Sequence, residues 1–236
     1  FPLADRATRE QYMRDILRPA VDHATRKGLY VIIDFHEISN VTAEKDAMAR
    51  AFWRYMAGQF ADYENVIYEL FNEPIDKGSG CVSGDNDDCW PPFKAQAEGW
   101  TAIVRESAPS TLVLVGGPSW SQVIGPAADD PVGDPNVGYV GHIYPTHTNG
   151  GNDDVEQQIR RCAAVHPVIL TEWGFGFAGR DDREPYATLV KTMADELELS
   201  FTAWVADPEW DPPMLTADGG LTEFGAFAQA WLAEQE

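Results

Sequence analysis

Short runs of β-branched and aromatic residues alternate with stretches of helical periodicity along most of the chain. In residues 8–27, apolar side chains recur at helical spacing, and the stretch ends at Gly28, a residue type that commonly follows a helix. Residues 29–35 are apolar at nearly every position, which is typical of a parallel strand buried on both faces. The alternation continues, with helices predicted at 43–62, 93–107, 153–165, 184–197 and 221–232, and strands at 66–73, 111–116, 136–143, 167–172 and 200–204.

Strands that alternate with helices predict a parallel sheet with right-handed crossovers. Polar residues gather where the predicted strands end, and a (β/α) barrel takes its catalytic groups from several such strand ends. No glycine-rich phosphate loop follows a strand, which disfavours a nucleotide-binding sheet. We therefore expect an α/β fold over residues 1–236 as one domain, a TIM-type barrel reduced to about six parallel strands and either open or completed by other segments.

Two glutamates end apolar runs and are followed at once by a turn residue. Glu73 closes the run at 66–73 and precedes Pro74, and Glu172 closes the run at 167–172 just before Trp173 and Gly174. The tips of parallel strands meet at one edge of a sheet, so these two carboxylates are expected to face one another. Paired carboxylates are the groups that cleave glycosidic bonds, which indicates a glycoside hydrolase.

Charge narrows the class of partner. The 236 residues carry a formal net charge of −21, which argues against a nucleic-acid backbone or an anionic membrane surface as partner. No apolar stretch approaches the ~20 residues needed to span a bilayer. A neutral polysaccharide suits this surface better than a polyanion does.

Three cysteines bear on the compartment. Cys81 and Cys89 lie in one Gly/Asp-rich loop and predict a small disulfide-closed loop in an oxidising, extracellular setting, with a reduced pair as the alternative. No histidine lies near them, and the acidic run at 85–88 lacks the full spacing of a calcium loop, so no metal site is predicted. The chain begins at Phe1 without a visible leader, which suggests numbering that starts after processing or trimming.

The strand ends together form a familiar series. They read, in order, Asp34-Phe35-His36, Phe71-Asn72-Glu73-Pro74, His142-Ile143-Tyr144, Thr171-Glu172-Trp173-Gly174 and Ala203-Trp204. From about Leu29 to the C-terminus, the chain resembles glycoside hydrolase family 5, whose members are retaining barrel hydrolases. No cofactor is implied by the resemblance.

The resemblance implies a role for each matching position. Glu73 would be the general acid/base and Glu172 the nucleophile, while Asn72 would hydrogen-bond the sugar 2-hydroxyl. His142 and Tyr144 would orient the two carboxylates. His36 would line the subsite near the scissile bond, and Trp204 would stack on the sugar. Endo-β-1,4-glucanase is the first expectation for the activity, and the alternatives are an endo-β-mannanase, a xylanase or a catalytically silent carbohydrate-binding barrel. Further aromatic residues in loops that either form subsites or pack are Trp90, Trp120, Trp173 and Trp210.

The chain departs from the family pattern at its start. Only one predicted helix precedes the strand at 29–35, so the family's first two strands, and the arginine that ends the second, have no counterpart. The strands at 29–35 and 200–204 would then be unpaired edges. Three explanations stay open: a reduced barrel with residues 1–9 or a loop in the gap, a homodimer through the exposed edges, or a fragment of a longer product.

Overall fold

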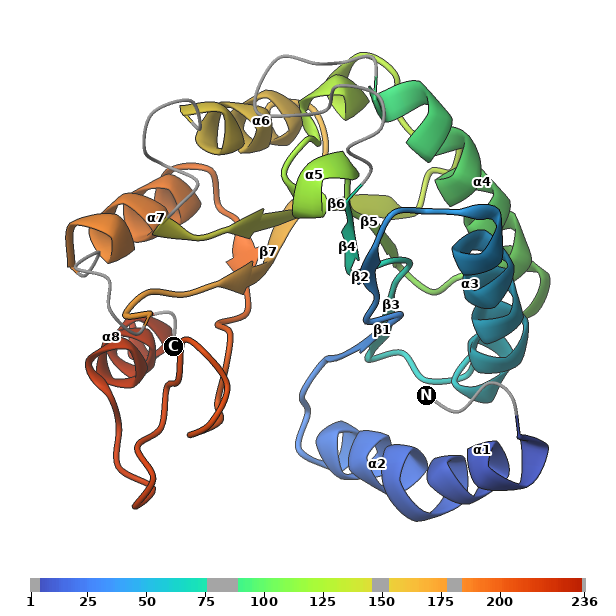
Figure 1. Ribbon diagram of the computed structural model, residues 1–236, viewed down its shortest axis with the longest axis horizontal. Helices are drawn as coiled ribbons and strands as arrows, with labels where there is room; N and C mark the ends of the chain where they lie inside the picture. Colours follow the sequence, from blue (N-terminus) through green and yellow to red (C-terminus); the bar gives the residue numbers. More distant parts are fainter. Residues whose placement is uncertain (1–4, 76–88, 146–152, 178–183, 235–236) are drawn as a thin grey trace.

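Six parallel strands form one continuous, curled sheet whose spatial order follows the chain (Figure 1). The computed structural model describes residues 5–75, 89–145, 153–177 and 184–234. The strands are β1 (Val31–Asp34), β3 (Val66–Glu69), β5 (Val113–Val115), β6 (Val137–Ile143), β7 (Val168–Trp173) and β8 (Ser200–Phe201). This half-barrel confirms the predicted fold class of a TIM-type barrel reduced to six parallel strands.

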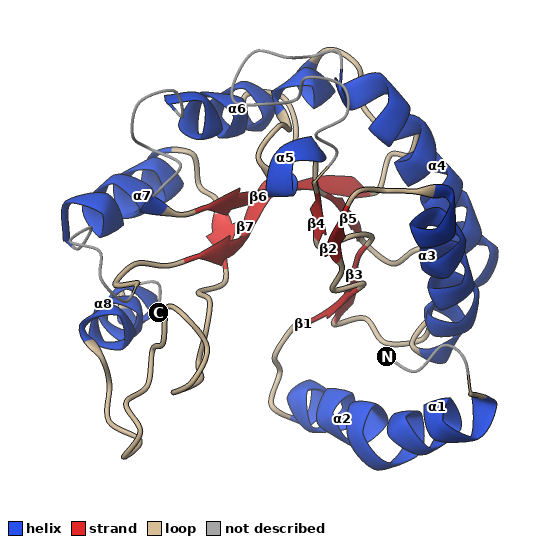
Figure 2. Cartoon of the chain, in the orientation of Figure 1, coloured by secondary structure: helices blue, strands red, loops and turns tan. Residues whose placement is uncertain are grey.

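Apart from the short α5, the helices lie around the outer face of the sheet and leave the inner face for the site (Figure 2). A near-continuous N-terminal helix comprises α1 (Arg6–Tyr12), a π-helical turn (Met13–Leu17) and α2 (Arg18–Arg26). The remaining helices are α3 (Ala43–Met56) with a 3₁₀ turn (Ala57–Gln59), α4 (Trp90–Ser107), α5 (Pro118–Ser121), a 3₁₀ turn (Gly125–Ala128), α6 (Asp153–Ala163), α7 (Glu184–Glu196) and α8 (Glu223–Ala233). Side-chain oxygens cap the first turns of α1, α3 and α8, from Asp5, Thr42 and Thr222 respectively.

A second, two-stranded sheet lies beyond the C-terminal ends of β1 and β3, where the sequence predicted a single longer strand. Strand β3 ends at Glu69, and Glu73 belongs instead to β4 (Glu73–Pro74), which pairs in parallel with β2 (Ile38–Ser39). The Glu73 amide donates to the Glu37 carbonyl at 3.0 Å. The backbone of Glu73 is therefore held by this small sheet rather than by the barrel strand.

The core fills the space between the sheet and the outer helices and is rich in aromatic residues. Trp90 and Trp173 are 1% and 0% exposed, so both pack in the interior and neither forms a sugar subsite. Trp53 donates its indole N–H to the Leu70 carbonyl at 3.0 Å, and Trp100 donates to Asp46 at 2.8 Å. These bonds satisfy the polar tips of buried rings, as large aromatic side chains require.

Strands β1 and β8 are the two free edges of the sheet, as predicted, but the prediction that the first strand is buried on both faces is wrong. Three of the four β1 residues are only partly buried, and the preceding Tyr30 is 76% exposed. The inner faces of both edge strands line a cavity of ≈ 770 Å³. Residues 5–9 do not fill this gap, because Arg9 lies over the Tyr55 ring of α3 instead.

An aromatic cluster fastens the edge strand β8 to the last helix. The Phe201 and Trp231 rings stack at 3.7 Å with an interplanar angle of 16°, and Trp173 meets Trp231 edge-on at 5.2 Å. The Trp231 indole N–H also donates to Asp195 of α7 at 3.2 Å. Since β8 has a strand neighbour on one side only, this cluster supplies the contacts that the missing neighbour would give.

Replacing Trp231, at the centre of this cluster, tests how much the cluster contributes to stability. We expect Trp231→Ala to lower the free energy of unfolding by about 3–5 kcal/mol, because it leaves a cavity among buried rings. Urea denaturation followed by circular dichroism measures the change. The exposed Trp210→Ala is the matched control and should change stability by no more than about 0.5 kcal/mol. Equal losses in the two variants would contradict the role given to the cluster.

Candidate active site

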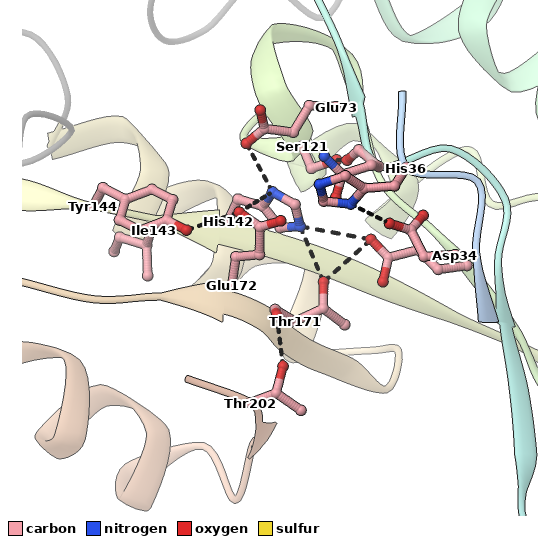
Figure 3. Close-up of polar contacts among 12 residues, drawn as sticks. Asp34, His36, Glu73, Ser121, His142, Ile143, Tyr144, Thr171, Glu172 and Thr202 are labelled. Carbon is pink, nitrogen blue, oxygen red and sulfur yellow. Dashed lines mark hydrogen bonds and ion pairs between the residues drawn. The ribbon is translucent and has the colours of Figure 1, made fainter. Parts of the chain in front are cut away.

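Both predicted catalytic carboxylates contact a single buried imidazole. His142 Nδ1 lies 3.0 Å from Glu73 Oε1 and 3.6 Å from Glu172 Oε2 (Figure 3). One ligand atom from each of the three residues lies within 4.8 Å of those of the other two, although β4 and β7 are far apart in sequence. The structure therefore places Glu73 and Glu172 across one gap, as the strand-end pattern predicted.

Tyr144 and Asn72 contact the Glu172 carboxylate from two sides. The Tyr144 hydroxyl donates to Oε2 at 2.7 Å. The Asn72 amide, in the orientation that satisfies both its polar atoms, donates to Oε1 at 3.0 Å. Both carboxylate oxygens thus accept a hydrogen bond, which favours the charged form of a group otherwise buried.

His36 and Trp204 meet across the open side of the half-barrel. Their rings stack with centroids 5.4 Å apart and an interplanar angle of 15°, although one follows β1 and the other follows β8. Trp204 lies three residues beyond the end of β8, so it is a loop residue rather than the predicted strand residue. A Cβ on Gly174 would come within 2.7 Å of the Trp204 carbonyl oxygen, so only glycine permits this close approach beside Glu172.

A strained turn supports the segment that carries Asn72 and Glu73, and this turn was not predicted from the sequence. Ser119, Trp120 and Ser121 have φ values of 59°, 58° and 56°, three successive left-handed residues without a glycine. The Ser121 hydroxyl donates to the Asn72 carbonyl at 2.7 Å. The conformational strain of this turn therefore accompanies a hydrogen bond that positions Asn72, the residue next to Glu73.

Two further carboxyls lie beneath the predicted pair, and the sequence analysis assigned them no role. Glu69 is 2% exposed and its Oε1 lies 3.6 Å from His142 Nε2. Asp34 Oδ2 accepts from His36 Nδ1 at 2.7 Å. Asp34 and Glu69 both lie inside apolar strand runs. A charged residue in such a run is seldom buried without a partner, and this is the signal that could have identified them.

Electrostatics assign the charge of the central imidazole. Burial alone would lower the pKa of His142, but contacts with Glu69 and Glu73 and the charge of Glu172 outweigh it and raise the pKa to about 10. His142 is therefore a cation at neutral pH. For Glu172, burial raises the pKa, while the His142 charge and the Tyr144 hydrogen bond oppose the rise.

His142 supplies the positive charge at this site. Within the described ranges, no lysine or arginine forms an ion pair with Glu73, Glu172, Glu69 or Asp34. Glu73, His142 and Glu172 have the composition and spacing of a metal-binding set. In the arrangement seen, however, His142 Nδ1 already contacts Glu73, and the set is accounted for by hydrogen bonds among its own members.

Comparison with known proteins identifies the family. The profile of the cellulases, glycosyl hydrolase family 5, matches residues 4–209. The chain belongs to glycoside hydrolase family 5. Endoglucanase A of Evansella cellulosilytica is 33% identical over 199 residues, which cover 81% of this chain and 38% of that protein. An endoglucanase of Clostridium saccharobutylicum is 29% identical over 229 residues, which cover 94% of this chain and 47% of that protein.

Solved structures show the same fold. A β-glucanase from Saccharophagus degradans superposes with a TM-score of 0.77 at 24% identity and covers 100% of this family 5 chain and 76% of its own. The chain thus spans less than half of these two curated relatives, and three quarters of this structural neighbour. Among the described helices, none has the length and apolar character of a membrane span.

The cysteine prediction is tested only in part. Cys89 is disulfide-bonded and Cys162, on α6, is a free and buried thiol. Cys81 lies outside the described residues, as does the acidic run at 85–88. The Cys81–Cys89 pairing therefore stays a prediction.

The raised pKa of His142 predicts how stability depends on pH. Between the ordinary value of 6.5 and about 10, the folded chain binds a proton at His142 that the unfolded chain releases, so stability falls as pH rises through this range. His142→Gln should lose this part of the fall between pH 6 and pH 9, measured by urea denaturation at both values. The exposed His23→Gln should keep the wild-type difference. If His142→Gln keeps it too, His142 is not the group responsible.

Proposed function

We propose that this chain hydrolyses β-1,4-glucan with retention of anomeric configuration, with Glu172 as nucleophile and Glu73 as general acid/base. Glu172 attacks the anomeric carbon while Glu73 gives its proton to the departing glycosidic oxygen, which leaves a covalent glycosyl-enzyme. Glu73 then takes a proton from water, the water attacks the same carbon, and the bond to Glu172 breaks.

The observation that carries the proposal is the closeness of the two carboxylates. Their oxygens lie within 4.8 Å, and retaining enzymes hold their carboxyls roughly 5–5.5 Å apart, whereas inverting enzymes need a wider gap for water. The hydrogen bonds from Tyr144 and Asn72 favour ionised Glu172, which is the state of a nucleophile. Glu73 has one imidazole contact and is the group left to carry the transferable proton.

Aromatic rings beside the carboxylates support a sugar polymer as substrate. Trp204 is half-buried, and the exposed Trp210 meets its ring at 5.8 Å with an interplanar angle of 67°, so two aromatic rings adjoin beside the carboxylates. Sugar faces stack on such rings, and family relatives are named endoglucanases. The S. degradans β-glucanase was solved with cellotetraose. Glucan is therefore placed before mannan and xylan.

Secretion and assembly complete the proposal. An acidic surface and a disulfide-bonded Cys89 suit an extracellular enzyme acting on an insoluble polymer. The free edges β1 and β8 keep a homodimer through those edges as a prediction, since unpaired edges are normally covered. Size-exclusion chromatography with mass measurement gives the oligomeric state directly.

Amide substitution at each carboxylate tests the proposed roles. Glu172→Gln and Glu73→Gln should each lower kcat on carboxymethylcellulose by about three orders of magnitude. Circular dichroism should show an intact fold. The exposed Glu98→Gln is the control and should keep wild-type turnover. Near-normal activity in either amide variant would remove that residue from the mechanism.

Stereochemistry and binding separate the remaining alternatives. Proton NMR of fresh cellopentaose digests should show β-anomers first, and α-anomers would overturn the retaining assignment. Wild-type binding to glucan, mannan and xylan without turnover on any of them would select the silent carbohydrate-binding barrel instead.

A further inference from the structure

Asp34 and Glu69 occupy facing positions on adjacent strands beneath the catalytic carboxylates. They are register partners in the β1–β3 ladder, and neighbouring parallel strands lie about 4.8 Å apart. Both side chains line the cavity inside the half-barrel, together with Glu172. The two carboxyls therefore lie side by side on the inner face of the sheet.

Each of these carboxyls contacts a different histidine of the site. Asp34 accepts from His36, whose ring stacks on Trp204. Glu69 contacts His142 directly, and also through Thr171, whose hydroxyl lies 3.0 Å from His142 Nε2 and 3.3 Å from Glu69 Oε1. Asp34 is thus connected through His36 to Trp204. Glu69 is connected through His142 to Glu73 and Glu172.

We propose that Asp34 and Glu69 are positioning residues, with Asp34 orienting His36 and Glu69 orienting His142. Neither touches the reacting atoms. The proposal deepens the proposed hydrolase function and rests on it only where turnover is the readout.

The charged groups around Asp34 and Glu69 are carboxyls and imidazoles. The carboxyls are Asp34, Glu69, Glu73 and Glu172, and the imidazoles are His36 and His142. The Tyr144 hydroxyl also donates to Glu172.

The surroundings of Asp34 fit the role of proton holder. Its Oδ1 atom is buried and has no hydrogen-bond partner among the described residues. Burial and the charge of Glu69 raise the pKa of Asp34 to about 7, against the lowering effect of His36 and His142. A proton on Asp34 relieves its repulsion with the neighbouring Glu69 carboxyl.

Carboxyl NMR tests the proton without any need for turnover. In wild-type protein labelled at side-chain carboxyl carbons, one resonance should titrate near pH 7, and Asp34→Asn should abolish it. Imidazole NMR of the same samples should show the pKa of His36 lowered in Asp34→Asn, because that hydrogen bond is its largest raising influence. Glu69→Gln should lower the pKa of His142 by about one unit or more.

Kinetics then separate positioning from mere structural support. Asp34→Asn should raise KM roughly two- to fivefold with little change in kcat, because His36 loses charge and orientation over Trp204. Glu69→Gln should lower kcat and move the alkaline limb of its pH profile to lower pH, because His142 loses its proton earlier. The control is Asp46→Asn, which removes a half-buried acid outside the site. Asp46 accepts hydrogen bonds from Trp100 and Arg50, and its replacement should leave the pH profile unchanged.

Specific outcomes would overturn the inference. Absence of any carboxyl titrating between pH 6 and pH 8 refutes a protonated Asp34, whether or not the chain is an active hydrolase. Unchanged histidine titrations in folded Asp34→Asn and Glu69→Gln refute the positioning roles. An inactive wild type that still shows the predicted titrations would refute the hydrolase and leave the carboxyl pair standing.

Discussion

The site depends on one fully buried imidazole in contact with three carboxyls. His142 has no exposed surface, and its two nitrogens face Glu73 and Glu172 on one side and Glu69 on the other. A buried cation costs much free energy unless anions surround it, and buried anions need a cation for the same reason. The imidazole and its carboxyls therefore stabilise one another, and their contacts link β3, β4, β6 and β7.

The rest of the architecture serves this cluster from outside. Helices on the outer face give β5, β6 and β7 an apolar backing, and the Trp231 cluster does so for β8, which has only one strand neighbour. The short β2–β4 sheet and the strained turn at Ser121 fix the backbone around Glu73. The residues of the candidate site thus come from elements of very different regularity.

The sequence predicted the order and type of the six strands because each is a compact apolar run between turn residues. It also predicted that Glu73 and Glu172 meet, since parallel strands bring their tips together. It did not predict that Glu73 leaves the barrel strand, because a two-residue pairing with Ile38 and Ser39 produces no periodic pattern. The left-handed turn at Ser119 was invisible without a glycine, and Asp34 and Glu69 read as ordinary members of strand motifs. Their importance arises only from neighbours distant in sequence.

The open side of the half-barrel has a consequence for the interior of the sheet. The cavity reaches from Glu172 and Trp204 at one end to Tyr30 and Leu112 at the other, and Asp34 and Glu69 belong to its lining. The lower carboxyls therefore border a hollow, whereas a closed eight-stranded barrel fills its interior with packed side chains.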